Sequence, residues 1–312
     1  MYRKRSFLFA VLGLFAVSAP AIERTEQHAW PVGDTPLVQL QTFRGAIRVE
    51  TAKSSQVELE LTARTSDESD RVWLNGLSLR ADQFGSGLAL RLERAGNGVE
   101  LTLRQPPVRQ VLLVLRVPAG AQLDLLTRDG GVDIGNDMAS RVRVHTEQGD
   151  VYIGRVNGSV KVDTLRGNLS VARAAGDLDL RNRQGDILVG TVVGASRLKA
   201  DSGNIEITNV EGALEAEAVA GNLEVGFIRG VQQPAKLKAS AGDVHVKLDP
   251  AAAVDLQARS HWGRIKSDAA FADAATKSGK RRLTAQLNGG GPLLMLDASG
   301  GDVRIEAAPS YL

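Results

Sequence analysis

Acidic and amide side chains that directly follow a glycine are the residues of this chain best suited to chemistry. They occur in nine-residue units such as Gly149-Asp150 and Gly185-Asp186. Nine-residue Gly/Asp repeats of the form G-G-x-G-x-D-x-U-x bind Ca²⁺ through oxygen ligands. Here each unit has one glycine with the acid immediately after it, so the second glycine and the spaced aspartate are missing. We therefore predict no metal and no cofactor.

Glycan-cleaving chemistry would need a paired acid and base held in a groove. The acidic residues are instead spread along the repeat, between basic and amide residues, and turns of this length leave no long loops for a cleft. The four histidines, His28, His145, His245 and His261, are scattered, and His245 is expected to point into solvent. No Ser, His and Asp arrangement has a recognisable spacing. The sequence predicts a protein that is not an enzyme, with no catalytic residue.

One basic cluster could contact anions. It comprises Lys277, Lys280, Arg281 and Arg282, next to a predicted hairpin. Four cations on one surface loop could touch anionic lipid, lipopolysaccharide or an acidic partner. We interpret the cluster first as a solvated face and keep anion contact as the weaker alternative.

The element that positions all these residues is a short repeat. Nine glycines recur at intervals of nine residues: Gly149, Gly158, Gly167, Gly176, Gly185, Gly194, Gly203, Gly212 and Gly221. Each is followed by an apolar-x-apolar strand, as in Val151-Tyr152-Ile153, and we expect a positive φ at each glycine corner. Successive units alternate in kind, so two strands and two corners make one coil of 18 residues. The sequence therefore predicts an all-β fold, a β-solenoid with about 18 residues per coil.

Stacking places equivalent residues of successive coils beside one another. The residue after the glycine forms a column of carboxylates and amides: Asp150, Asn168, Asp186, Asn204 and Asn222. Such an Asx ladder is expected to satisfy backbone groups at the turns and to separate like charges by amides. We interpret these residues, like the turn glycines, as structural.

The flanks are less regular than the repeat. We predict a signal peptide at 1–21, a linker at 22–36, an N-terminal β-layer that caps the coil at 37–125, the regular solenoid at 126–230, and irregular coils with a closing hairpin at 231–312. The closing hairpin is expected to join Leu283–Leu287 to Leu293–Leu296.

The predicted signal combines three basic residues, an apolar run of 11 residues and small residues at Ala19 and Ala21. The apolar run is too short to span a bilayer. Removing residues 1–21 takes away three of 38 basic residues and none of 36 acidic ones, which leaves a formal charge of −1. A near-neutral chain has no general electrostatic reason to bind nucleic acid. We expect export, with a periplasmic location favoured over the cell surface, and no membrane span after signal removal.

Several segments resemble a known bacterial family. They are Arg116-Val117-Pro118-Ala119-Gly120, the serial Gly-Asp/Asn strands, and the ending from Asn288-Gly289-Gly290-Gly291-Pro292 to Gly301-Asp302-Val303. With them the chain resembles the bacterial "putative adhesin" domain of unknown function, in the toast-rack and auto-transporter adhesin-head (GIN) superfamily. The resemblance covers residues 37–306 and implies the solenoid architecture, but no catalytic residue.

Three functions remain open from the sequence. The first is a secreted cell-envelope β-solenoid that acts as a non-enzymatic, adhesin-like scaffold or interaction module, whose partner is an envelope protein or surface component. The second is an accessory sensor in envelope-stress signalling, which the related domains suggest. The third, least favoured, is a polysaccharide-active β-helix enzyme.

Overall fold

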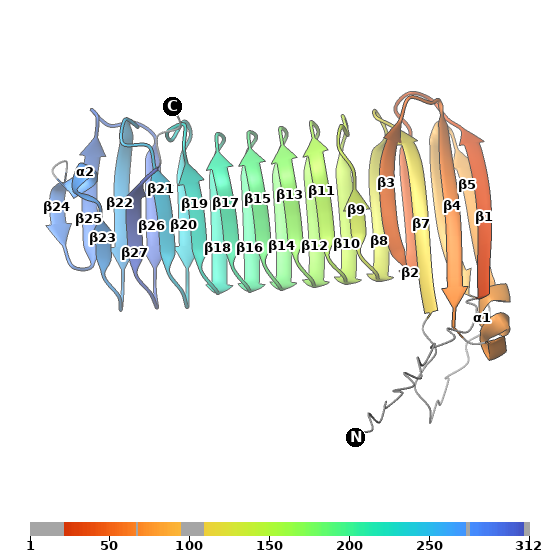
Figure 1. The fold of residues 1–312 in the computed structure, drawn as a ribbon. Coiled ribbons are helices and arrows are strands. Elements are labelled where there is room, and N and C mark those ends of the chain that lie inside the picture. Colours follow the sequence, from red (N-terminus) through yellow and green to blue (C-terminus); the bar gives the residue numbers. More distant parts are fainter. Residues whose placement is uncertain (1–21, 67, 95–108, 273–274, 309–312) are drawn as a thin grey trace, which may run out of the picture.

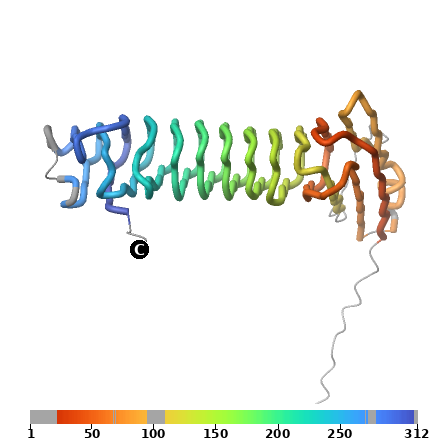
Figure 2. Tube along the Cα trace, turned by 90° about the horizontal axis from the view of Figure 1, so that it is seen from above, coloured from red at the N-terminus to blue at the C-terminus, as the bar shows by residue number. Residues whose placement is uncertain are grey.

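The chain forms a straight rod built from two long β-sheets (Figure 1). The computed structural model describes residues 22–66, 68–94, 109–272 and 275–308. We call the 13-stranded sheet sheet A and the 14-stranded sheet sheet B. The chain passes from one sheet to the other at every corner, so successive coils follow one another along the rod (Figure 2). The predicted signal peptide at 1–21 lies outside the described residues.

The central coils have the predicted repeat. Their sheet A strands are β9 (Val132–Ile134), β11 (Val151–Val156), β13 (Leu169–Ala174), β15 (Ile187–Val192), β17 (Ile205–Val210) and β19 (Leu223–Phe227). Their sheet B strands are β8 (Gln122–Asp129), β10 (Val142–Gln148), β12 (Val160–Arg166), β14 (Leu178–Gln184), β16 (Ser196–Ser202) and β18 (Leu214–Ala220). The pairs Val151↔Leu169 and Ile187↔Ile205 are parallel and 18 residues apart, which confirms the predicted β-solenoid.

Side chains alternate between the core and solvent along each strand. Val151 and Ile153 of β11 are buried and face Val160 and Val162 of sheet B across a thin apolar core. Full burial of such a side chain is worth about 1.5–3 kcal/mol. The core continues through every coil, so each coil is stabilised mainly by its two neighbours.

The N-terminal end is threaded out of sequence order. Its elements are β1 (Ile22–Pro31), β2 (Leu37–Arg44), β3 (Ala46–Ala52), β4 (Gln56–Thr65), η1 (Glu68–Asp70), α1 (Arg71–Asn75), β5 (Leu77–Phe84), β6 (Gly87–Arg94) and β7 (Arg109–Pro118). The coil β2–β3 lies inside the stack: β2 pairs with β6 and β8, and β3 pairs with β7 and β9, all in parallel. The later strands therefore cover the first coil.

Residues 22–36 were predicted to be a linker, and this is wrong for 22–31. These residues form β1, which pairs with β4 in antiparallel register along its whole length, from Ile22↔Thr65 to Pro31↔Gln56. The segment lacks a clean apolar alternation, and its backbone hydrogen bonds to a distant strand define it instead.

The C-terminal end is threaded in a similar way. Its elements are β20 (Ala235–Ala239), β21 (Val244–Leu248), β22 (Val254–Ser260), β23 (Ile265–Ser267), α2 (Ala269–Ala272), β24 (Ala275–Gly279), β25 (Arg282–Leu287), β26 (Leu293–Ala298) and β27 (Val303–Ala307). The last coil, β26–β27, is inserted between β20–β21 and β22–β23.

The predicted closing hairpin of Leu283–Leu287 with Leu293–Leu296 is therefore wrong. Strands β25 and β26 lie on opposite sides of β22, the first antiparallel and the second parallel to it. The loop between them passes the start of β22, where the Asn288 side chain donates hydrogen bonds to the carbonyls of Pro250 and Ala252, both at 2.9 Å. The hairpin partner of β25 is β24.

Candidate interaction surfaces

The repeat glycines lie where the backbones of neighbouring coils come closest. Gly149, Gly167, Gly185 and Gly203 have φ between +129° and +143°, as expected. The intervening Gly158, Gly176, Gly194 and Gly212, and also Gly221, are not in the left-handed region. A Cβ on Gly212 would still lie 2.2 Å from the Gly194 carbonyl oxygen. The expectation of positive φ is therefore wrong for these five, and close coil-to-coil stacking is what requires glycine there.

The Asx column forms a continuous ladder of side chain to backbone hydrogen bonds. The backbone N–H of Asn168 donates to Asp150 Oδ1 at 2.7 Å, and the same bond recurs at Asp186, Asn204 and Asn222 with lengths of 2.7–3.0 Å. The ladder extends through Asp243 and Asp302 and ends at the backbone N–H of Arg264. Each of these side chains thus spends an oxygen on fixing the register between coils.

The outer face of sheet A carries an apolar patch. Tyr152 on β11 and Leu188 on β15 are 47% and 45% exposed, and Ser170 lies between them in the same register. Arg155 and Arg173 form the neighbouring column. We call Tyr152, Ser170 and Leu188, with these two arginines, the sheet A patch. It is flat, because strands in regular parallel register support it.

The outer face of sheet B is covered by ion pairs between coils. Lys161 Nζ lies 2.9 Å from Asp179 Oδ2, and Arg197 Nε lies 3.2 Å from Glu215 Oε2. Exposed pairs of this kind contribute about 0–1 kcal/mol each. Their charges are already matched within the rod.

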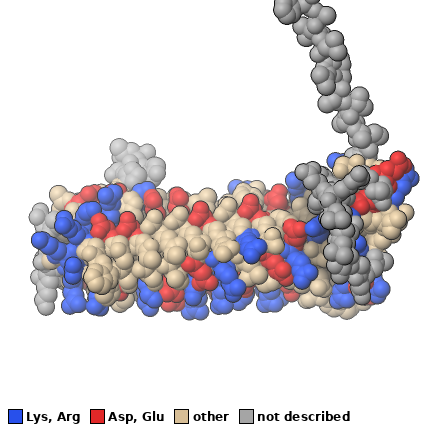
Figure 3. Space-filling view, turned by 90° about the horizontal axis from the view of Figure 1, so that it is seen from below, with Lys and Arg blue, Asp and Glu red and all other residues tan. Residues whose placement is uncertain are grey.

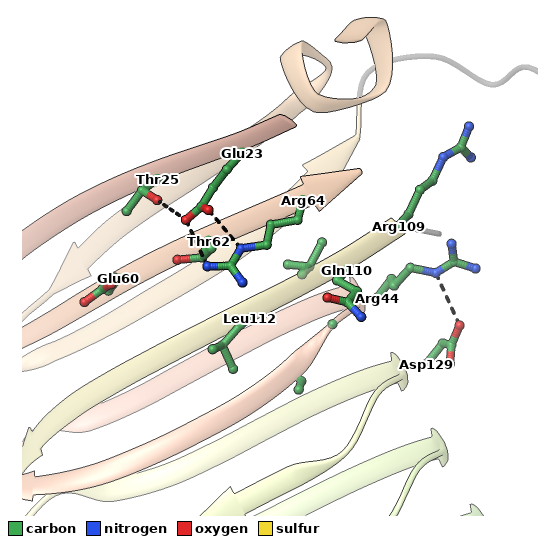
Figure 4. A pocket seen from close by; sticks show the side chains of 13 residues that line it. Glu23, Thr25, Arg44, Glu60, Thr62, Arg64, Arg109, Gln110, Leu112 and Asp129 are labelled. Carbon is green, nitrogen blue, oxygen red and sulfur yellow. Dashed lines mark hydrogen bonds and ion pairs between the residues drawn. The ribbon is translucent and has the colours of Figure 1, made fainter. Parts of the chain in front are cut away.

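A groove of about 870 Å³ lies at the N-terminal end, between β1, β4, β7 and β3 (Figure 4). Its carboxylates face arginines: Glu23 is 2.9 Å from Arg64, and Asp129 is 3.3 Å from Arg44. Glu60, the remaining lining carboxylate, lies 3.9 Å from Arg116. These partners favour the ionised carboxylates, whereas a general acid must hold a proton. The groove does not have the arrangement of an acid–base pair.

A buried ion pair lies beside this groove, and the sequence gave no warning of it. Asp70 accepts hydrogen bonds from Arg109 Nε and Nη2, both at 2.7 Å, and the two side chains are each 9% exposed. The Arg109 guanidinium holds the pKa of Asp70 below its usual range. The guanidinium also lies over the ring of buried Trp73, 5.5 Å from its centroid. This cluster fastens α1 to β7 and has a structural role.

The predicted basic cluster lies at the C-terminal end of the rod. Lys280 and Arg281 form the turn between β24 and β25, Arg282 begins β25, and all three are exposed. Lys277 lies on β24, and its side chain falls outside the described ones. The structure brings this turn against the corner that carries Trp262, a contact that the sequence analysis did not connect with the cluster.

The four histidines do not converge. They lie on β1, β10, β21 and the corner after β22. His245 is not the freely solvated side chain that was predicted: it is 23% exposed, with Nε2 2.9 Å from Glu306 Oε2 and Nδ1 3.8 Å from Glu224. Within the described ranges, no group of three or more His, Asp or Glu side chains has an arrangement that could hold a metal ion. Those ranges also contain no helix of the length and apolarity needed to cross a membrane.

Known proteins with this fold are bacterial. The model of the Toastrack DUF4097 family matches residues 38–306. The chain is similar to the solved structure of a "Putative lipid binding protein" from Parabacteroides distasonis ATCC 8503, with 12% identity, a TM-score of 0.50, and coverage of 90% of this chain and 96% of that one. It is also similar to a "putative adhesin" from Parabacteroides merdae ATCC 43184, with 10% identity, a TM-score of 0.41, and coverage of 90% and 96%. No curated protein matches the chain. At these identities the likeness concerns the fold alone.

Proposed function

The chain belongs to the Toastrack DUF4097 family, and from that premise we propose that it is an exported, non-enzymatic interaction module of the cell envelope. The predicted signal at 1–21 supports export, and we favour the periplasm as its location. The rod would hold a protein partner on the sheet A patch. A rigid, flat surface suits a partner recognised by shape rather than a small molecule enclosed in a pocket.

The observation that carries this proposal is the exposure of Tyr152 and Leu188 on one column. Aromatic side chains are enriched in protein interfaces because they bury a large apolar area while keeping one polar group. The column is otherwise polar or charged, with Ser170 between the two and Glu206 after them. Arg155 and Arg173 beside it would form a charged rim around an apolar centre.

The ends of sheet A are less suited to a partner than its face. On the edge strand β1, Arg24 points inward and donates hydrogen bonds to the carbonyls of Leu74 at 2.6 Å and Leu77 at 3.1 Å, and it pairs with Glu26. Inward-pointing charges on an edge strand discourage the addition of another strand. The opposite edge strand, β23, has only three residues.

Photo-crosslinking in the producing bacterium tests this proposal. A photoreactive phenylalanine analogue at position 152 should give a discrete crosslinked product that is absent when the analogue replaces Leu126 on sheet B. The double variant Tyr152→Ser, Leu188→Ser imitates the native Ser170 and should abolish capture of the same partner.

The matched control is Leu126→Ser, Val219→Ser, which removes two apolar side chains, each 37% exposed, from sheet B. It should capture the partner as the unaltered protein does. Equal crosslinking from both sheets, or no product from position 152, would refute the sheet A patch as the binding surface.

A further inference from the structure

The corner of the terminal coil displays a tryptophan where the neighbouring coils have small residues. The residue before each corner glycine is Ser202, Ala220, Ala241 and Gly300 in the preceding coils, and Trp262 in the coil at the end of the rod. Trp262 is 80% exposed, the highest exposure of any described tryptophan. An indole left in water at this position has no packing role in the described structure.

Regular structure fixes this corner. A Cβ on Gly263 would lie 2.3 Å from the Gly301 carbonyl oxygen, so the corner stacks closely on the coil below it. The Arg264 backbone N–H donates to Asp302 Oδ1 at 2.8 Å and thereby completes the Asx ladder. The ladder position that carries Asp or Asn in the other coils is here occupied by a cation.

Exposed cations surround the tryptophan corner. Arg259 at the end of β22 lies directly opposite Arg282 of β25, and directly opposed like charges destabilise a sheet. Lys280 and Arg281 follow in the adjoining turn. In the part of the chain that the structure describes, none of these four residues, nor Arg264, forms an ion pair. Their charges are therefore left for an external anion.

Backbone hydrogen bonds join the cations and the tryptophan into one surface. The Ser260 N–H donates to the Arg281 carbonyl at 3.0 Å, and the Ile265 N–H donates to the Lys280 carbonyl at 2.9 Å. The turn thus contacts the Trp262 corner on both of its sides. Lys and Arg atoms gather at this end of the rod in the view from below (Figure 3). We call Trp262, Arg259, Arg264, Lys280, Arg281 and Arg282 the C-terminal tip.

We propose that the C-terminal tip docks on the surface of an anionic lipid bilayer. Tryptophan is enriched at membrane–water interfaces, where its apolar ring and polar N–H both find suitable surroundings. Clustered Lys and Arg beside such an anchor are attracted by anionic headgroups. The tip is a corner at the end of a rod, a shape that can meet an extended surface. The rod would then stand away from the membrane with the sheet A patch accessible.

Vesicle binding by the purified protein tests the proposal. The probes are vesicles of phosphatidylcholine alone and vesicles that also contain phosphatidylglycerol. We expect binding only to the second kind, weakened by added salt because the attraction is between exposed charges. The triple variant Lys280→Gln, Arg281→Gln, Arg282→Gln should bind at least about tenfold more weakly. The control Arg141→Gln, Arg173→Gln, Arg183→Gln removes the same charge elsewhere on the rod and should bind within about twofold of the unaltered protein.

Tryptophan fluorescence gives a readout that charge alone would not move. Trp73 is buried and Trp30 is half-buried, so an emission shift to shorter wavelength on anionic vesicles should come from Trp262 and vanish in Trp262→Phe. The variant Tyr152→Ser, Leu188→Ser should bind vesicles normally, which separates this proposal from the proposed function. Equal binding to neutral vesicles, no binding at all, or equal losses in both triple variants would refute it. So would polyglutamate binding as tight as vesicle binding, which would indicate an acidic protein partner.

Discussion

Asn204 Oδ1 accepts a hydrogen bond from the backbone N–H of Asn222 at 2.9 Å, one coil further along the rod. The side chain of one coil thereby satisfies the backbone of the next at a corner, where the parallel ladder is interrupted. An aspartate can make the same bond, because only the Oδ1 acceptor is needed. This explains why Asp and Asn exchange freely in this column while the position keeps its function.

Replacing Asn204 with alanine should lower the free energy of unfolding by about 0.5–1.5 kcal/mol, because the Asn222 N–H loses its protein partner. The matched variant Asn204→Asp keeps the acceptor and should lose less. Urea unfolding followed by circular dichroism measures both. Equal losses in the two variants would show that the hydrogen bond is not what the position contributes.

Glycine substitutions should separate backbone conformation from stacking. Gly203→Ala combines φ +143° with a Cβ 2.0 Å from the Gly185 oxygen, and should cost about 3 kcal/mol or more. Gly212→Ala has the close contact, at 2.2 Å, without a left-handed φ, and should cost about 1–3 kcal/mol. Gly85→Ala has φ +57° but no atom within 4 Å, and should cost about 1 kcal/mol.

The informative comparison is between Gly212 and Gly85. If stacking is the dominant requirement, alanine at position 212 destabilises more than alanine at position 85 in the same urea experiment. The reverse order would mean that corner conformation, and not the contact between coils, selects glycine.

The variant Asp70→Asn should destabilise the N-terminal end by about 3–5 kcal/mol, because it leaves the buried Arg109 guanidinium without its counter-charge. Glu23→Gln removes a partner of the half-exposed Arg64 and should cost no more than about 1 kcal/mol. Hydrogen exchange of β7 and β4 amides would locate the loss in the first variant. A loss below 1 kcal/mol for Asp70→Asn would show that Arg109 finds another partner.

The repeat predicted the coil because its register is local: residues 18 apart determine both the strands and the core. The ends could not be predicted in this way. Placing β26–β27 between β20–β21 and β22–β23 depends on pairings between segments separated by irregular loops. Strand β1 is defined by its hydrogen bonds to β4 and carries little pattern of its own.

The candidate surfaces were predictable to different degrees. Tyr152 and Leu188 stand out in sequence because the repeat assigns them to an outward position. Trp262 could have been found in the same way, since it precedes Gly263 as Ala241 precedes Gly242. Its proximity to Lys280 and Arg281 could not, because it arises from a hairpin that folds back onto β22.

The pair of Glu217 and Lys238 should make a contribution to stability that depends on pH at both extremes. Glu217 Oε1 lies 2.8 Å from Lys238 Nζ, and this hydrogen bond lowers the pKa of Glu217 and raises the pKa of Lys238. The lowered carboxyl pKa gives stability that is present above the unfolded value near about 4.3 and lost as pH falls through the folded value. The raised ammonium pKa gives stability that is present below about 10.4 and lost as pH rises through the folded value.

The difference in unfolding free energy between the unaltered protein and Glu217→Gln should therefore be largest between about pH 5 and pH 10 and shrink on either side. Its plateau should not exceed about 1 kcal/mol and should fall with added salt, because both side chains are partly exposed. Glu206→Gln is the control, since Glu206 forms no ion pair in the described parts of the chain, and its difference should stay flat above pH 5. A pH-independent difference for Glu217→Gln would mean that packing, and not the ion pair, is what the substitution removes.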